Sequence, residues 1–172
     1  MAMEFIYDDG GRAEAGFKGS AGDCVVRAIA IATGKPYREV YDALHAGAKE
    51  VNERRRKYFK PRGRTSPRNG VSRVVYEPYL LSLGFKWTPT MKIGQGCKVH
   101  FVKEELPPGV LVVALSKHLT CVIDGIVHDT YNPQRGSTTW YKTGPDVTEH
   151  TVDHVSPDRC VYGIYSKPSE AA

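Results

Sequence analysis

The chain has 172 residues, of which 41% are hydrophobic and 25% charged, and its formal net charge is +5. This length and composition are typical of one globular domain, and they exclude a chain that is disordered throughout, a collagen and a coiled coil. No apolar stretch approaches the roughly 20 residues of a membrane span, and no signal peptide is visible. We therefore expect a single domain over residues 1–172, cytoplasmic and without a membrane partner.

The N-terminal part is predicted to contain one buried helix. Residues 1–19 are rich in Gly and charge and indicate an irregular lead-in. The compact apolar run Asp23–Thr33 favours a buried helix over a strand because of its length and alanine content. Ser20 or Asp23 is the expected cap of this helix, and Gly34 is expected to end it.

Two further helices are expected before the middle of the chain. Apolar residues recur at helical spacing over Tyr37–Tyr58 and again over Val71–Leu83. Pro78 predicts a kink in the later helix, or a start near Glu77. Between the two, residues 60–70 contain Pro, Gly and basic residues and predict a loop.

In the second half of the chain, short runs rich in β-branched residues predict strands. These runs are Phe85–Trp87, Val99–Val102, Val110–Leu115, Leu119–Ile123, Ile126–Thr130 and Cys160–Tyr165. The polar stretch Pro133–Asp158 is expected to be irregular, with at most a short strand over Thr138–Tyr141, and residues 166–172 form a tail. Helices followed by strands predict an α+β fold with an antiparallel sheet.

One segment carries most of the excess positive charge. Nine of the 24 Lys and Arg residues lie between Arg54 and Arg73, with no Asp or Glu among them. Three interpretations stay open: a solvated helix end and loop, a nucleic-acid footprint with aromatic residues for stacking, or a loop that selects an acidic substrate or protein partner. The candidate binding residues are Arg62, Arg64 and Arg68.

Cys24 is the most informative single residue. It stands at the predicted start of the first helix, where unpaired backbone N–H groups and the helix dipole favour a thiolate. The thiolate is the nucleophilic form of cysteine. The alternative is that Cys24 is a small apolar residue packed under the helix.

The hairpin predicted at Asp124-Gly125 supplies a base and an acid for such a nucleophile. A two-residue loop pairs Cys121 with His128 and places His118 and Asp129 as diagonal neighbours on one face of the sheet. Asp129 can then fix the tautomer of His118 and support its imidazolium form. The alternative is an ordinary surface pair of His and Asp.

Together these features resemble the papain-like cysteine peptidase superfamily. The resemblance rests on Gly-Asp-Cys at a helix start, on Ser-Lys-His before a strand, and on a return strand that ends in an acid, over about Ser20–Thr33 and Leu106–Pro133. The chain looks most like peptidases that cut bacteriocin leaders and like small uncharacterised bacterial and phage proteins. The resemblance implies that N-terminal helices pack on an antiparallel sheet and that Cys24 is the nucleophile, with His118 as base and Asp129 as orienting acid.

The same resemblance implies a thiol hydrolase that cleaves peptide or isopeptide bonds without a cofactor. Asn132 is an alternative orienting residue. The Gln that the family carries before its cysteine is absent, and Lys18 and Ser20 are the candidate donors to the oxyanion in its place. The alternative function is an inactive papain-like scaffold that binds nucleic acid or an acidic partner through residues 54–73.

The remaining cysteines favour structural roles. Cys121 and Cys160 lie in predicted strands and are expected to be reduced core residues, as is usual in a cytosol. Cys97 and His100 form a single CxxH pair, which is too few ligands for zinc. We therefore expect no metal site.

Overall fold

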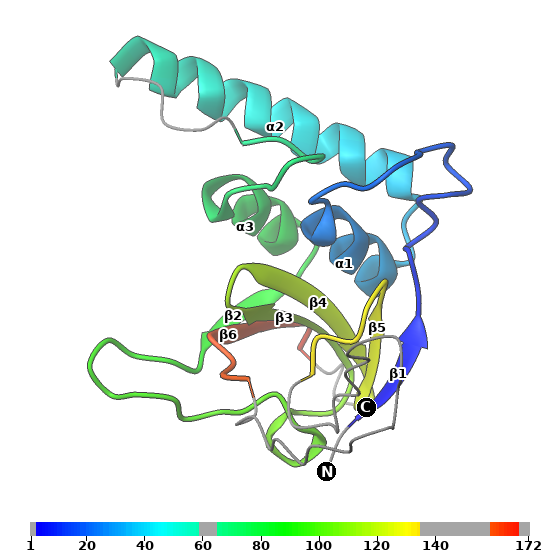
Figure 1. Cartoon of the computed structure of the whole chain (residues 1–172). Coiled ribbons are helices and arrows are strands. Elements are labelled where there is room, and N and C mark those ends of the chain that lie inside the picture. The colour runs from blue at the N-terminus through cyan, green and yellow to red at the C-terminus, as the bar shows by residue number, and fades with distance from the viewer. Residues whose placement is uncertain (1–2, 59–64, 135–158, 169–172) are drawn as a thin grey trace, which may run out of the picture.

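The computed structural model describes residues 3–58, 65–134 and 159–168. In these residues, three α-helices are layered on one side of a six-stranded sheet (Figure 1). The helices are α1 (Cys24–Thr33), α2 (Tyr37–Tyr58), α3 (Arg73–Ser82) and a short 3₁₀ helix, η1 (Lys103–Glu105). The strands are β1 (Glu4–Tyr7), β2 (Lys86–Pro89), β3 (Val110–Leu115), β4 (His118–Ile123), β5 (Ile126–Asp129) and β6 (Gly163–Ser166). The α+β prediction is confirmed.

The sheet is mixed rather than antiparallel, which corrects the sequence prediction. Its strand order is β1-β5-β4-β3-β6-β2, and β1 pairs with β5 in parallel while the other neighbours are antiparallel. The lead-in predicted over residues 1–19 therefore contains an edge strand. Because Glu4–Tyr7 pairs with residues distant in the sequence, neither a hairpin signal nor a long apolar run marks it.

The helices agree closely with their predicted spans. Gly34 follows α1 in the left-handed conformation, with φ 66°, which glycine adopts without strain. Asp23 occupies the position before α1, but its side chain makes no capping hydrogen bond. Pro78 lies inside α3 rather than at its start.

The predicted hairpin register is confirmed. Cys121 pairs with His128, and β4 and β5 are joined through Asp124 and Gly125, both at positive φ as a tight hairpin turn requires. The hairpin places His118 at the beginning of β4 and Asp129 at the end of β5.

Both faces of the sheet are buried. On the helical side, α1 and α2 contribute Val26, Ile29 and Leu44 to a core that also includes Leu119 and Tyr165 of the sheet. On the opposite side a second core is formed by Phe101, Leu106, Leu111, Val113, Val122, Val127 and Ile164, among others. Since both cores include residues of β3 and β4, these central strands are packed on both faces.

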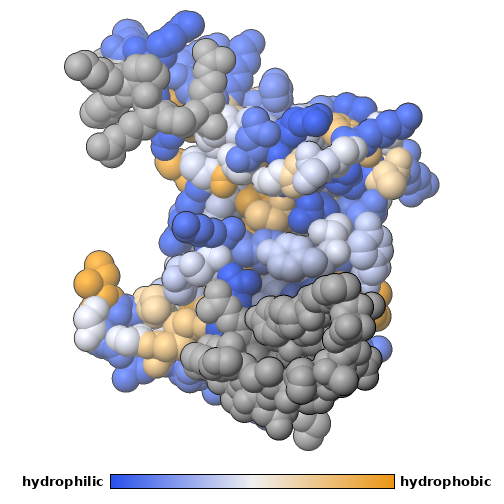
Figure 2. All heavy atoms as spheres, viewed as in Figure 1, coloured by the Kyte–Doolittle hydropathy of each residue, from blue (hydrophilic) through white to orange (hydrophobic). Residues whose placement is uncertain are grey.

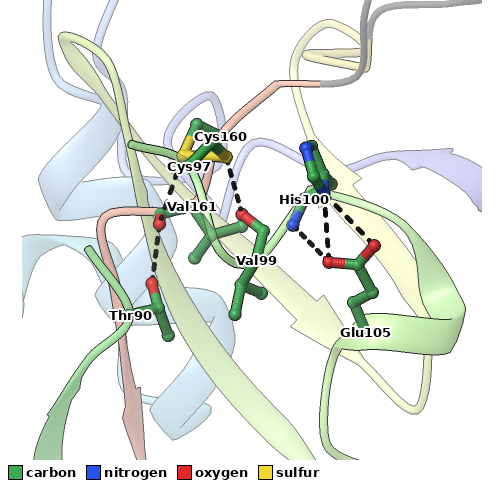
Figure 3. Close-up of a disulfide and its surroundings, with 7 residues drawn as sticks. All are labelled: Thr90, Cys97, Val99, His100, Glu105, Cys160 and Val161. Atoms are coloured by element: carbon green, nitrogen blue, oxygen red, sulfur yellow. Dashed lines mark hydrogen bonds and ion pairs between the residues drawn. A yellow bond between two sulfur atoms is a disulfide. The ribbon is translucent and has the colours of Figure 1, made fainter. Parts of the chain in front are cut away.

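The segment before η1 differs from its prediction. Val99–Val102 forms no strand; its contact with the later chain is an isolated bridge between His100 and Cys160. At this bridge Cys97 and Cys160 form a disulfide, which corrects the expectation that Cys160 is a reduced core residue (Figure 3). The two cysteines are 63 positions apart, so local spacing gives no sign that they meet.

The disulfide closes the base of a projecting segment. Figure 1 shows the chain after β2 leaving the body, and Figure 2 shows a hydrophobic tip on this projection with a hollowed surface between it and the helices. Ile93 is fully exposed in this segment, and Met91 is partly exposed. None of the described helices is long and apolar enough to cross a membrane.

Gly163 makes room for an aromatic side chain that borders this hollow. A Cβ on Gly163 would fall onto the ring of Trp87, which also packs 4.5 Å from Tyr165 between ring centroids. We predict that Gly163→Ala lowers the free energy of unfolding by about 1–3 kcal/mol through overpacking. Urea denaturation should show that this cost nearly vanishes in a Trp87→Ala background; an equal cost in both backgrounds would contradict the assigned contact.

Candidate active site

A pocket of about 840 Å³ opens where the start of α1 meets the start of β4. Cys24, the first residue of α1, lines it and is half-buried. His118 lines it from β4, and Trp87 and Tyr162 form part of its aromatic wall. The structure therefore brings Cys24 and His118, the nucleophile and base predicted from the sequence, together in one accessible pocket.

His118 is held by the acid predicted for it. Its Nε2 lies 2.6 Å from Oδ2 of Asp129, and both side chains are buried. The ring also packs against Tyr131, at 4.9 Å between centroids. Because Nε2 is bound to the carboxylate, Nδ1 is the nitrogen left for a partner in the pocket.

That partner is the thiol of Cys24. Burial raises the pKa of Cys24, but hydrogen bonds with His118 and with the backbone of Leu119, together with the charges of His118 and Arg27, leave the pKa below its ordinary value. Burial lowers the pKa of His118, but its hydrogen bonds with Asp129 and Cys24 raise it to about 9. Both shifts favour a thiolate paired with an imidazolium.

The surroundings of Asp129 keep its carboxyl group ionised. Burial raises its pKa, but the hydrogen bond and charge of His118 and the backbone N–H of Thr130 bring the pKa below its ordinary value. The N–H of Thr130 donates to Oδ1 at 2.7 Å, which leaves Oδ2 for His118. The carboxylate thus stabilises the imidazolium from the side away from the pocket.

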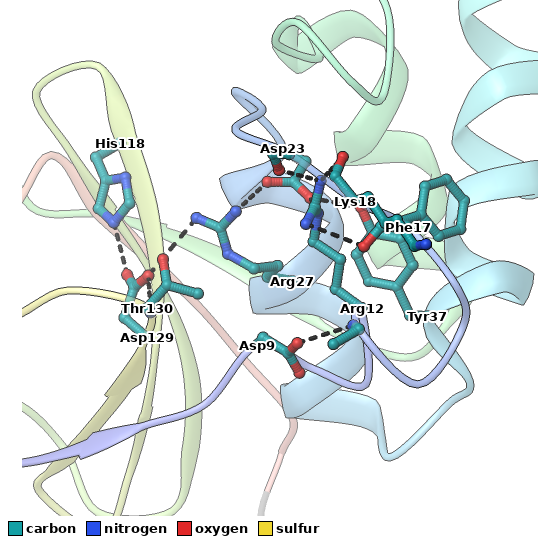
Figure 4. A network of polar contacts seen from close by, with 12 residues as sticks. Asp9, Arg12, Phe17, Lys18, Asp23, Arg27, Tyr37, His118, Asp129 and Thr130 are labelled. Carbon is teal, nitrogen blue, oxygen red and sulfur yellow. Dashed lines mark hydrogen bonds and ion pairs between the residues drawn. The ribbon is translucent and has the colours of Figure 1, made fainter.

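A buried ionic network joins the cysteine helix to this acid. Asp23 accepts hydrogen bonds from Arg27, from Nε of Arg12 at 2.8 Å and from the hydroxyl of Tyr37 at 2.5 Å. The other terminal nitrogen of Arg27 is 3.8 Å from Oδ1 of Asp129. Figure 4 shows the guanidinium of Arg27 lying between Asp23 and the His118–Asp129 pair.

Sequence reasoning did not assign Arg27 or Arg12 to the site. A usable signal was present, because Arg27 is a charged residue inside an apolar helical run and stands four positions after Asp23. Four positions place the two side chains on the same face of a helix end. The involvement of Arg12 and of Asp129 in one network depends on tertiary packing, which no local pattern reveals.

The other predicted site residues lie elsewhere. Lys18 and Ser20 are exposed, and neither lines the pocket; the Lys18 carbonyl accepts a hydrogen bond from Arg12. The side-chain oxygen of Asn132 accepts hydrogen bonds from Gln134, whereas Asp129 occupies the Nε2 position of His118. The donors expected near Lys18 or Ser20 therefore receive no support from the geometry.

The basic segment borders the pocket only in part. Arg62 and Arg64 lie outside the described residues, as does the strand considered over Thr138–Tyr141. Arg68 is exposed and does not line the pocket, but the next residue, Asn69, does.

No other described cysteine competes with Cys24. Cys121 is buried, as predicted, and burial raises the pKa of its thiol. Cys97 and Cys160 are joined to each other. Among the described residues there is no group of three or more His, Cys, Asp or Glu side chains able to hold a metal ion.

Comparisons with protein-family models, with curated proteins and with solved structures found no match for this chain. The resemblance to papain-like peptidases therefore stays a prediction from the sequence.

The chain offers a matched pair of variants to test the buried network. Asp23–Arg27 and Glu50–Arg54 are both ion pairs four positions apart, one buried and one about 70% exposed at each side chain. Because Arg27→Met leaves buried carboxylates without their partner, it should lower the free energy of unfolding by about 3–5 kcal/mol. Arg54→Met should cost less than about 1 kcal/mol.

Urea denaturation of both variants measures this difference. Similar losses for Arg27→Met and Arg54→Met would show that the network does not stabilise the fold.

Thiol labelling tests the state of Cys24. Since its pKa is lowered, the thiolate of Cys24 forms at lower pH than that of an ordinary thiol, so the pH midpoint of iodoacetamide labelling should be lower for Cys24 in the native protein than for the same thiol in the denatured protein. His118→Gln should move this midpoint upward because a positive partner is removed.

Mass mapping of the labelled native protein provides the control. Label should be absent from Cys121 and lost altogether in Cys24→Ser. Equal labelling of Cys121 and Cys24 would rule out a selectively activated thiol.

Proposed function

We propose that the chain is a cysteine hydrolase of peptide or isopeptide bonds, with papain-like chemistry. The observation that carries the proposal is the chain of interactions from Cys24 through His118 to Asp129, arranged at an open pocket. A nucleophile, a base and an orienting acid are the three parts that thiol-dependent acyl transfer requires.

In the first half of the reaction, the Cys24 thiolate attacks the carbonyl carbon of the scissile bond. A sulfur–carbon bond forms, and the carbonyl oxygen takes the electron pair as an oxyanion near the backbone N–H of Cys24. The intermediate collapses as the carbon–nitrogen bond breaks. The His118 imidazolium gives its proton to the leaving amine, and a thioester remains on Cys24.

In the second half, neutral His118 takes a proton from water, and the oxygen attacks the thioester carbon. The carbon–sulfur bond breaks, the acid product leaves, and Cys24 returns to its thiolate while His118 is again protonated. Asp129 keeps the ring oriented through both halves because its bond to Nε2 leaves Nδ1 directed to the sulfur side.

The position of the cysteine also supports activity over an inactive scaffold. Each end of the interaction chain has a buried support. Asp129 accepts a hydrogen bond from the N–H of Thr130, and Asp23, the residue before Cys24, is held by hydrogen bonds from Arg12 and Tyr37. A scaffold that only binds a partner through residues 54–73 has no need for a thiol with a lowered pKa beside a protonated imidazole.

Cleavage of a peptide mixture tests the proposal. A mixture of synthetic linear peptides and lysine-branched isopeptides that covers all residue types is incubated with the protein, and new ends are found by mass spectrometry. Wild type should produce new ends, Cys24→Ala should produce none, and Asp129→Asn should be slower by at least about 100-fold because His118 loses its orienting partner.

Cys121→Ala is the matched control and should retain wild-type rates, since that thiol is buried away from the pocket. Equal cleavage by wild type and Cys24→Ala, or no cleavage by any form, would refute the proposed function.

The pH profile of kcat/KM gives a second test. Activity should rise as the thiolate of Cys24 forms, at a pH below that of an ordinary thiol, and should fall near pH 9 as His118 loses the proton that the leaving amine needs. A profile that only begins to rise near pH 8.5 would contradict the thiolate–imidazolium pair.

A further inference from the structure

The charges that line the pocket have one sign. Arg27, Arg73, Lys117 and His118 line it, and none of the described lining residues is Asp or Glu. A concave surface with charges of one sign attracts and orients ligands of the opposite sign.

Two of these cations are already compensated. Arg27 is held by Asp23 and lies near Asp129. Arg73 lies 2.6 Å from a carboxylate oxygen of Glu77, and its guanidinium stacks 4.2 Å from the ring centroid of Trp87. Their carboxylate partners stand behind the pocket surface, so these arginines contribute little net charge to it.

Lys117 differs from both arginines. It is exposed, it stands next to His118 in the chain, and it forms no ion pair with any residue that the structure describes. Its ammonium is therefore the uncompensated permanent charge among the described residues of the pocket wall.

The backbone at Lys117 is also unusual. Ser116 and Lys117 form the two-residue connection between β3 and β4, since Leu115 pairs with His118, and Lys117 has φ 55°. The other tight hairpin turn places Asp124 and Gly125 at positive φ, residue types that tolerate this region. A lysine is strained there, and strained residues at a site point to a role of their side chain.

We propose that Lys117 is a specificity-determining residue that binds a carboxylate of the substrate beside the scissile bond. The inference rests on the proposed hydrolase function and names its substrate class: peptides with Asp or Glu close to the bond that is cut. Because Lys117 precedes the base directly, a carboxylate bound to its ammonium would hold the scissile carbonyl near Cys24 and His118.

The test uses the peptides that wild type cleaves in the mixture. Each is synthesised again in pairs that differ only by Glu or Gln at one position near the cut, and kcat/KM is measured for each pair. Wild type should prefer the Glu peptide by about two- to five-fold at one position, in line with an exposed ion pair. Lys117→Gln should abolish the preference, and Lys117→Glu should reverse it.

Two further variants separate specificity from structure. Lys117→Gly relieves the backbone strain, so it should melt at or above the wild-type temperature and still lose the preference for Glu. Lys49→Glu makes the same charge change on α2, away from the pocket, and should keep the wild-type preference.

The outcomes distinguish the two proposals. Equal kcat/KM for the Glu and Gln peptides with wild type, or a preference that survives Lys117→Glu, would overturn the role of Lys117 while leaving the hydrolase proposal intact. Slower cleavage of both peptides alike in Lys117→Gln would also overturn it. A wild type that cleaves no peptide would overturn both.

Discussion

The site depends on how the first turn of α1 docks against the start of β4 and the end of β5. A helix and a hairpin from separate parts of the chain must meet so that Cys24 faces His118. The buried guanidinium of Arg27 stabilises this meeting because it pairs with Asp23 beside the cysteine and lies 3.8 Å from Asp129 of the hairpin. Removing either partner of such a buried pair leaves an uncompensated charge, so the helix and the sheet are strongly constrained to this arrangement.

The same arrangement determines the electrostatics of the pocket. The carboxylate of Asp129 lies behind His118 and favours its protonated form, while the protonated ring and the N-terminus of α1 favour the thiolate of Cys24. The negative charges of the site are thus the buried carboxylate of Asp129 and the thiolate of Cys24. The pocket wall presents positive charge, of which Lys117 has no partner among the described residues.

Much of this could be predicted from the sequence, for identifiable reasons. The helical spacing of apolar residues predicted the helices, and Gly34 predicted where the first one ends. The Asp124-Gly125 turn predicted the hairpin register and hence the pairing of His118 with Asp129. Features that depend on distant contacts were missed: β1 pairs with a strand far along the chain, and Cys97 meets Cys160 across 63 positions. Lys18 and Ser20, the expected oxyanion donors, do not line the pocket, because sequence proximity to Cys24 does not by itself place a side chain there.

An NMR titration of the His118 imidazole tests the central claim most directly, because it observes the base itself without a substrate. The account predicts that His118 titrates near pH 9 in the wild type, and that its pKa falls in Cys24→Ala because one of the two partners that raise it is removed. A His118 pKa near the ordinary value of about 6.5 in both proteins would contradict the thiolate–imidazolium pair.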